Sequence, residues 1–349
     1  MFLKKRYDFH VAMTGDISYD LHTGDGKNGD EFMNQLEPLL SRIPYMVIAG
    51  NHENDGRNFS NFQERFWMPH NGYHDNQFYS FDLGPVHWVG LSTEYYGYYQ
   101  SLGKGPVFTQ YNWLKQDLAH ANSNRHHTPW IISYLHRPFY CSAEYNDDCS
   151  GFDNSLIQLL GCNEESASNR IESKYRVPGY SVYNIRVGHD DLPGLEYPFL
   201  QYGVDLGFWG HVHYYERFYP VANKKYWNSG NCYHNAPAPT YVITGSAGCH
   251  TPNTPFDRTP VPFSAKRLND YGYTILTVAN RTHIHLQQLS VNKGESVVDE
   301  FWLSKDEGFV ASDKLRALTP GQDFPKPTLA KIPHNENYMP DWIDIPPIQ

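Results

Sequence analysis

The order of apolar and polar positions predicts that the chain begins with a strand, a helix and a second strand. Apolar residues cluster at positions 10–14 and again at 45–49, as in short buried strands. Between them, residues 31–41 carry apolar side chains at helical spacing on one face. A crossover of this length allows the two strands to run parallel, so we expect a β-α-β unit.

The same pattern predicts further elements along the chain. They are a hairpin at 77–82 and 85–91 around Gly84, an amphipathic helix at 110–121, strands at 130–134 and 204–209, and a loop-rich insert at about 141–195. The last third alternates between apolar and polar residues at 240–244, 273–278, 283–289 and 297–303, which predicts antiparallel strands of a second sheet. Residues after about 310 are rich in proline with weak periodicity, which is typical of a tail.

Composition narrows the possible partners. The chain has 349 residues, 40% of them hydrophobic, and a formal net charge of -10. A nucleic-acid partner is not expected, because binding to a phosphate backbone needs a basic face. A phosphate substrate would need positive charge from a bound metal, and the 18 histidines and 27 tyrosines justify a search for one. No apolar run approaches the roughly 20 residues that cross a bilayer, so we expect no membrane partner.

The cysteines, the sequons and the charged first residues say little about fold or function. Five cysteines leave at least one without a partner in the chain, while Cys141 and Cys149 flank a polar loop and could close a short ring. Cys232 with Cys249 is a weaker candidate pair. Two glycosylation sequons begin at Asn58 and Asn280, about the number expected by chance. The first eight residues lack the apolar stretch of a signal peptide.

Metal-capable side chains follow the ends of four predicted strands. They are Asp16 with Tyr19, Asn51 with His52, His136, and His211 with His213. In an open α/β sheet such residues meet outside the carboxyl ends of the strands. Residues two apart in an extended segment share a side, so His211 and His213 can face one pocket.

The residue types suit two different metal ions. The Asp16 carboxylate can bridge two cations, and the Tyr19 phenolate is a hard anionic donor that suits trivalent iron. Imidazoles and an amide oxygen suit a divalent ion, and two ions about 3.5–4 Å apart can hold a phosphate and activate water. Each residue alone is compatible with a turn or a packed ring, but the combination favours a metal site.

With these residues in this order, the sequence resembles the purple acid phosphatases of the calcineurin-like metallophosphoesterase superfamily. Four of that family's five metal-binding blocks are similar to Gly15-Asp16-Ile17-Ser18-Tyr19, Gly50-Asn51-His52-Glu53, His136-Arg137-Pro138 and Gly210-His211-Val212-His213. Further segments, including Tyr214-Tyr215-Glu216-Arg217 and Gly245-Ser246-Ala247-Gly248, are similar to the animal, high-molecular-weight branch. The resemblance covers about residues 7–305.

The resemblance implies a role for each candidate residue. Asp16 would bridge the metals, Tyr19 and His213 would bind Fe(III), and the divalent ion (Zn, Mn or Fe) would be bound by Asn51, His136 and His211. His52 would orient the phosphate and protonate the leaving group, as suits an imidazole near its pKa. Arg137 and Tyr215 would lie behind the ligands or at the rim of the site.

The resemblance also implies a fold, an activity and a location. We expect a four-layer α/β/β/α sandwich of two mixed sheets, with residues 1–305 as the catalytic domain and 306–349 as a proline-rich tail. A metal-bound hydroxide would attack small phosphate monoesters at acidic pH. The full-length family member would be a secreted or lysosomal glycoprotein.

The chain departs from the family at the first metal-binding block. In the family an Asp-x-Gly block ends an earlier strand and supplies the fourth ligand of the ferric site. Only 14 residues precede Gly15, and none forms this block. Asp8 cannot substitute, because it lies near the start of the next strand, about 20 Å from its end. We therefore expect the first strand and one ligand to be missing, which predicts a poor phosphatase.

Two alternative functions stay open. One is a broader metallophosphodiesterase, although Tyr19 favours the purple branch because generic relatives lack a phenolate ligand. The other is a truncated, catalytically silent product that binds a metal or phosphate without turnover.

Overall fold

The computed structural model describes residues 10–73, 75–142, 182–189, 192–248, 253–256 and 259–320. Most of the predicted insert at 141–195 therefore lies outside the described residues. Within them, no helix is both long enough and apolar enough to cross a bilayer.

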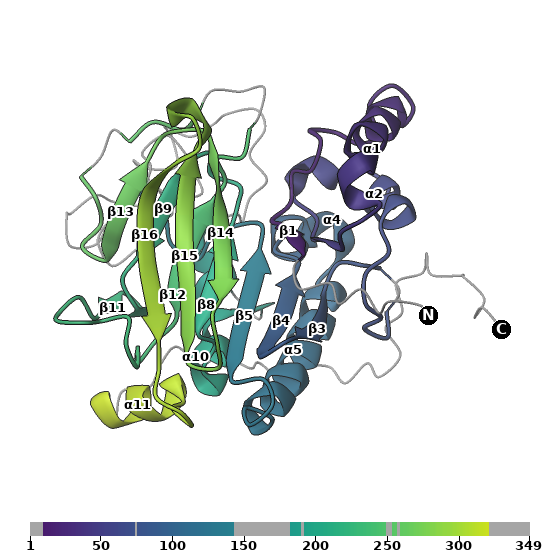
Figure 1. Ribbon diagram of the computed structural model, residues 1–349. Helices are drawn as coiled ribbons and strands as arrows, with labels where there is room; N and C mark the ends of the chain where they lie inside the picture. The colour runs from purple at the N-terminus through teal and green to yellow at the C-terminus, as the bar shows by residue number, and fades with distance from the viewer. Residues whose placement is uncertain are drawn as a thin grey trace, which may run out of the picture.

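A seven-stranded mixed sheet forms the centre of the molecule (Figure 1). Its order is β13 (Ser264–Leu268), β9 (Tyr215–Phe218), β12 (Thr240–Thr244), β8 (Leu206–Trp209), β5 (Trp130–Leu135), β4 (Val86–Leu91) and β3 (Tyr79–Leu83). Strands β4, β5, β8 and β12 run parallel, and the predicted β3–β4 hairpin is confirmed. The assignment of residues 240–244 to a second sheet is wrong, because β12 pairs with β8 and β9 and is buried on both faces.

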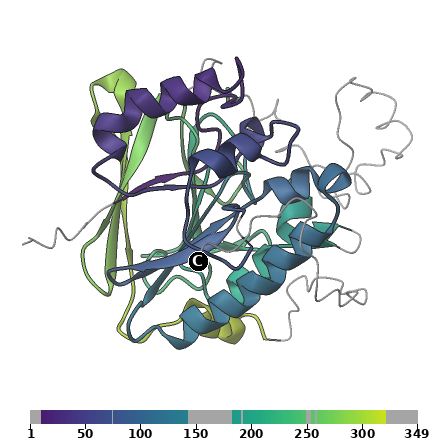
Figure 2. The same ribbon diagram turned by 90° about the vertical axis from the view of Figure 1, so that its right-hand side faces the viewer.

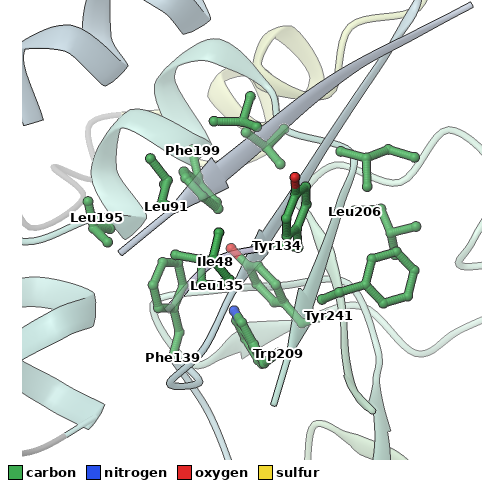
Figure 3. Close-up of a cluster of buried hydrophobic side chains, with 14 of the residues drawn as sticks. Ile48, Leu91, Tyr134, Leu135, Phe139, Leu195, Phe199, Leu206, Trp209 and Tyr241 are labelled. Atoms are coloured by element: carbon green, nitrogen blue, oxygen red, sulfur yellow. The ribbon is translucent and has the colours of Figure 1, made fainter. Parts of the chain in front are cut away.

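Helices cover one face of this sheet. The long helix α5 (Gly105–Ser123) and the short helix α10 (Glu196–Tyr202) lie behind the strands in Figure 1. Phe199 of α10 packs against Phe139, which in turn contacts Trp209 of β8. The ring of Trp209 stacks on Tyr241, and Figure 3 shows these side chains in one buried cluster. This cluster holds β8 against β12, and β8 leads directly to His211 and His213.

The other face is covered by a second layer of strands. An antiparallel sheet of β14 (Gly272–Val278), β15 (His283–Ser290) and β16 (Ser296–Ser304) packs on β9 and β12, where the Thr274 and Thr244 hydroxyls lie 2.8 Å apart. Beside it, the parallel pair β1 (Val11–Met13) and β2 (Tyr45–Val47) packs on β3, whose Tyr79 hydroxyl donates to the Val47 carbonyl. Within the described residues β1 pairs with β2 alone. The expected α/β sandwich is confirmed.

Helix α1 (Lys27–Leu40) connects β1 to β2, as the predicted β-α-β unit requires, and lies with α2 (Ser60–Arg65) at one end of the molecule (Figure 2). The remaining elements are shorter. They are η1 (Asn51–Glu53), α3 (Glu94–Gly97), α4 (Tyr99–Leu102), α9 (Val182–Val187), β6 (Gly188–His189), β7 (Leu192–Pro193), β10 (Val221–Ala222), β11 (Lys225–Tyr226), η2 (Val291–Lys293) and α11 (Ala311–Leu318).

Helix α11 lies in the segment that weak periodicity assigned to a tail. Its residue Leu315 is buried in a small apolar cluster with Leu200 of α10. A helix of eight residues is shorter than the stretch over which helical periodicity can be recognised in a sequence.

The cysteine predictions have different outcomes. Cys141 forms a disulfide, and Cys149, its predicted partner, lies outside the described residues. The weaker pair of Cys232 with Cys249 is wrong, because Cys232 is a free thiol.

Candidate metal centre

Loops that follow two pairs of parallel strands, β1–β2 and β5–β8, bring Asp16, Asn51, His136 and His211 together. The Nε2 atom of His136 lies 3.3 Å from Asp16 Oδ2, 3.1 Å from Asn51 Oδ1 and 3.1 Å from His211 Nδ1. One ligand atom each from Asp16, His136 and His211 fall within 4.8 Å of one another. This spacing suits a single cation held between them.

Glycine allows these loops to approach so closely. A Cβ atom on Gly50 would lie 2.3 Å from Asp16 Oδ1 and 2.7 Å from His136 Cε1. A Cβ atom on Gly15 would lie 2.6 Å from His136 Nδ1, and the φ angle of Gly15 is +86°. Glycine at both positions therefore sets the spacing of the ligands.

The ring of His136 is oriented by the backbone. Its Nδ1 atom lies 2.6 Å from the carbonyl oxygen of Thr14, which can only accept a hydrogen bond. The proton is therefore on Nδ1, and the lone pair on Nε2 points at Asp16 and His211. This is the tautomer that binds a metal through Nε2.

Charge favours an ionised Asp16 beside these rings. Burial opposes ionisation, but His136, His211 and His52 together hold the pKa of Asp16 below its usual range. In the same way, burial lowers the pKa of His136, and the neighbouring carboxylates of Asp16 and Glu94 raise it above its usual value. Positive charge is therefore stabilised at this position, whether it is carried by a proton or by a metal ion.

Glu53 is a buried carboxylate that sequence reasoning did not single out. Its oxygens accept hydrogen bonds of 2.8 Å from the backbone amides of Asp16, Ile17 and Gly50. Burial and the charge of Asp16 raise its pKa to about 7. Because it joins the loop of Asp16 to the loop of Asn51, it fixes two ligands relative to each other. Its place directly after Gly50-Asn51-His52 was the available signal.

Tyr19 and His213 form the second part of the site. The Tyr19 hydroxyl lies 2.8 Å from His213 Nε2, so one oxygen and one nitrogen donor meet without an intervening side chain. The ring of Tyr19 also packs on the ring of His52, with centroids 4.5 Å apart. The backbone amide of His52 donates to Asp16 Oδ1, which connects this pair to the Asp16 cluster.

The side chain of His52 lies at the open side of the site. Its side chain is 32% exposed, whereas His136 is fully buried. Asp20 Oδ1 lies 3.0 Å from His52 Nδ1, which places the second ring nitrogen away from this carboxylate. An exposed imidazole with one nitrogen anchored can exchange a proton with a bound molecule.

Arg137 lies directly behind His211. Its guanidinium makes two hydrogen bonds to the fully buried carboxylate of Glu94, and its Nη1 atom lies 2.8 Å from His211 Nε2. Thr93 accepts from the Arg137 backbone amide. Glu94 was not identified from the sequence, because it follows no recognisable motif.

Tyr215 is engaged elsewhere. Its hydroxyl donates to Asp299 of β16 over 2.8 Å, and Asp299 also accepts from Arg217. The structure therefore brings together Asp16, Asn51, His136 and His211, pairs Tyr19 with His213 beside them, and directs Tyr215 toward the β14–β15–β16 sheet.

The donor set fits two metal ions of unlike hardness. The Asp16 carboxylate, the Asn51 amide oxygen and the rings of His136 and His211 suit a divalent ion, and Nε2 of His136 is already aimed at the site. The Tyr19 oxygen and the His213 nitrogen suit a harder ion.

Comparison with known proteins gives two family matches. Residues 3–215 match the family described as calcineurin-like phosphoesterase, and residues 238–300 match the iron/zinc purple acid phosphatase-like protein C domain. The chain belongs to the purple acid phosphatase family. The first match includes β1, β2, β5 and β8, the strands that lead to the ligands.

Curated relatives support this assignment. The chain is 40% identical to acid phosphatase type 7 of Danio rerio over 305 residues, covering 85% of this chain and 62% of that protein. It is 41% identical to acid phosphatase type 7 of Homo sapiens, covering 84% and 60%, and 30% identical to purple acid phosphatase 21 of Arabidopsis thaliana, covering 81% and 54%. The chain thus spans about three fifths of the length of its acid phosphatase type 7 relatives.

A solved structure shows the same fold. The purple acid phosphatase PPD1 from yellow lupin seeds aligns with a TM-score of 0.62 at 23% identity, covering 86% of this chain and 47% of that one.

Proposed function

We propose that this purple acid phosphatase homologue hydrolyses small phosphate monoesters at acidic pH with an Fe(III) ion and a divalent ion, Zn, Mn or Fe. The observation that carries the proposal is the contact of Tyr19 with His213 beside the Asp16, His136 and His211 cluster. A phenol next to a carboxylate and three imidazoles is a donor set for unlike metals, and it distinguishes this site from that of a general metallophosphodiesterase.

The proposed ligands divide into two sets. Tyr19 and His213 would hold the ferric ion, Asn51, His136 and His211 would hold the divalent ion, and the Asp16 carboxylate would serve both ions. When bound, the two ions would polarise the phosphate and lower the pKa of a water molecule. Thr14 fixes the ligating tautomer of His136, and Glu53 fixes the loops of Asp16 and Asn51.

The residues around the ligands handle the substrate. His52, partly exposed and anchored by Asp20, orients the phosphate and donates a proton to the leaving oxygen. Arg137, held by Glu94, supplies positive charge beside His211. We assign these steps to residues 1–305 as one catalytic unit. We further propose a secretory or lysosomal location, which the disulfide of Cys141 supports, because disulfides persist in oxidising compartments.

The test uses colour and turnover together. The purified chain, loaded with iron and zinc, should bind both metals, absorb visible light through a phenolate-to-iron transition, and hydrolyse 4-nitrophenyl phosphate at acidic pH. Tyr19→Phe should abolish the band. Tyr215→Phe is the matched control and should keep it, because its hydroxyl bonds Asp299.

Three outcomes would contradict parts of the proposal. A band that survives Tyr19→Phe would remove Tyr19 from the site. Faster hydrolysis of bis(4-nitrophenyl) phosphate than of the monoester would favour the metallophosphodiesterase. Bound iron with a visible band but no turnover would favour the catalytically silent protein.

A further inference from the structure

The loop between β1 and α1 holds two residues of the site in an uncommon backbone conformation. Tyr19 and Asp20 have φ angles of 51° and 82°, in the left-handed region that residues other than glycine rarely adopt. Such a conformation persists only where the surrounding structure fixes it. The loop therefore needs a partner, and that partner decides where the side chains of Tyr19 and Asp20 point.

The side chain of Asn28, in the first turn of α1, contacts this loop through its amide nitrogen. Nδ2 lies 3.1 Å from the carbonyl oxygen of Ser18 and 3.0 Å from that of Asp20. The carbonyl oxygen of Tyr19 lies 3.5 Å from the same nitrogen. A carbonyl oxygen only accepts hydrogen bonds, so the nitrogen of the amide, and not its oxygen, must face the loop. The two amide protons thus hold the backbone before Tyr19 and after Asp20.

The start of α1 is itself fixed in place. The backbone amide of Gly29 donates to the Leu21 carbonyl over 3.1 Å, and Arg65 of α2 donates to the Gly26 carbonyl over 2.8 Å. A Cβ atom on Gly29 would lie 2.6 Å from Arg65 Nε, so α1 approaches the Arg65 side chain closely here. Asn28 therefore extends from a part of the helix that contacts on both sides hold.

The two side chains of the held loop lead to different parts of the site. The Tyr19 hydroxyl lies 2.8 Å from His213 Nε2, and Asp20 Oδ1 lies 3.0 Å from His52 Nδ1. The rings of Tyr19 and His52 also pack on each other, with centroids 4.5 Å apart. A change at Asn28 should therefore reach the phenol and the exposed imidazole together, through the backbone.

We propose that Asn28 is a positioning residue, which directs Tyr19 toward His213 and Asp20 toward His52 through its hydrogen bonds to the loop. It acts through the backbone that it holds and not by contact with the phosphate. Its part in the reaction rests on the proposed function, whereas its effect on Tyr19 can be measured in the metal-free chain.

A purely structural role for Asn28 predicts a different result. Loss of its hydrogen bonds would then lower the stability of the fold and leave Tyr19 in place. The positive φ angles of Tyr19 and Asp20 argue against this, because a released loop can relax toward negative φ. Such a change in φ redirects the side chains that the loop carries.

The first measurement uses the chain loaded with iron and zinc. Asn28→Leu removes both donors, and Asn34→Leu, at an exposed position of the same helix, is the matched control. Asn28→Leu should lower the visible absorbance per bound iron and lower kcat about tenfold, as for other groups behind metal ligands. Asn34→Leu should change neither. Asn28→Gln keeps two donors on a longer side chain and should restore part of both.

The second measurement is fluorine NMR of the metal-free chain, in which 3-fluorotyrosine replaces tyrosine. The Tyr19 signal is assigned by its absence from Tyr19→Phe. Asn28→Leu should shift this signal and leave that of a distant tyrosine such as Tyr134 in place. Asn34→Leu should shift neither signal.

Two results would overturn the inference. One is a Tyr19 signal that stays in place in folded Asn28→Leu, and the other is an unchanged absorbance per bound iron. If Asn28→Leu does not fold, Asn28→Ser, which keeps one donor, is measured by the same criteria. A displaced Tyr19 signal in a chain without turnover would support the inference and refute the proposed function alone.

Discussion

Each end of the strand pair β5 and β8 has a buried carboxylate, but the two carboxylates have different partners. At the carboxyl ends, Asp16 meets the imidazole rings of His136 and His211. At the amino ends, the carboxylate of Asp205 meets two basic side chains, with Arg125 Nη1 at 3.0 Å and Lys305 Nζ at 2.9 Å. The same two strands therefore have potential metal ligands at their carboxyl ends and hydrogen-bond donors from Arg125 and Lys305 at their amino ends.

The amino-end cluster is closed by its own side chains. Asp205 also accepts from the amide of Ile131, and Lys305 donates to the carbonyl of Pro129 and lies 4.0 Å from the Trp130 ring centroid. Burial lowers the pKa of Lys305 to about 8, which is still high enough for a charged amine at neutral pH. A cluster that supplies its own cations is a structural network, whereas one that presents lone pairs at a common point is suited to take up a cation from solution.

The largest expected effect is on metal binding, and it should distinguish Asp16 from Asp205. Asp16→Asn should remove the bridging charge and lower iron content and phosphatase activity by more than about 100-fold, since even groups behind the ligands contribute 10–100-fold in metal sites. Metal analysis and turnover give the measurement. Asp205→Asn is the matched control and should keep its metals. Equal metal loss in both variants would show that the two ends do not differ.

The second prediction concerns the stability of the closed cluster. Lys305→Met should lower the free energy of unfolding by about 3 kcal/mol, because it leaves a buried carboxylate with one cation fewer. Denaturant titration measures this change, and metal content should stay unchanged. Adding Asp205→Asn to Lys305→Met should recover part of the loss. Two losses that simply add would indicate that the residues act independently.

The third prediction tests how the open cluster is held together. Glu53→Gln keeps the size of the side chain but turns one acceptor into a donor that faces backbone amides. Affinity for the metals should fall about 10–100-fold, with ligands Asp16 and Asn51 both intact. Isothermal titration with Zn²⁺ gives the value. Unchanged affinity would mean that the two loops keep their spacing without this carboxylate.

The smallest expected effect on stability concerns His87, a histidine between two aspartates that becomes a cation only when it is protonated. His87 of β4 lies between Asp82 of β3, at 2.7 Å, and Asp117 of α5, at 3.0 Å. Burial lowers the pKa of His87, but Asp117 and Asp82 outweigh it and raise the pKa above the usual value.

Because the folded pKa is raised, the stabilisation is fully present below about pH 6.5 and is lost as the pH rises through the folded pKa. His87→Gln should therefore cost about 1 kcal/mol at pH 5 and less at pH 8, as Asp82 is half exposed. Thermal melts at both pH values test this. A larger cost at pH 8 would reverse the sign of the argument.

The sequence predicted the ligand-bearing strand ends because they combine local signals, an apolar run and a polar turn. Asp16, Asn51, His136 and His211 each follow such a run, and the order of the strands brings them together. Glu94, Asp205 and Lys305 were not predicted, because their importance depends on burial beside residues distant in the sequence. The sheet of β12 was misassigned for the same reason, since strand pairing is a long-range property.

The glycines at the strand ends have a consequence for engineering. Gly15 and Gly50 leave no room for a β-carbon between the loops, so the main chain itself sets how far apart the ligand side chains begin. Exchanging ligand side chains, for instance to change the preferred ion, leaves that spacing intact. Alanine at Gly50 would push the loops apart and abolish binding of every ion alike. Redesign of this scaffold should therefore vary the ligands and leave the glycines unchanged.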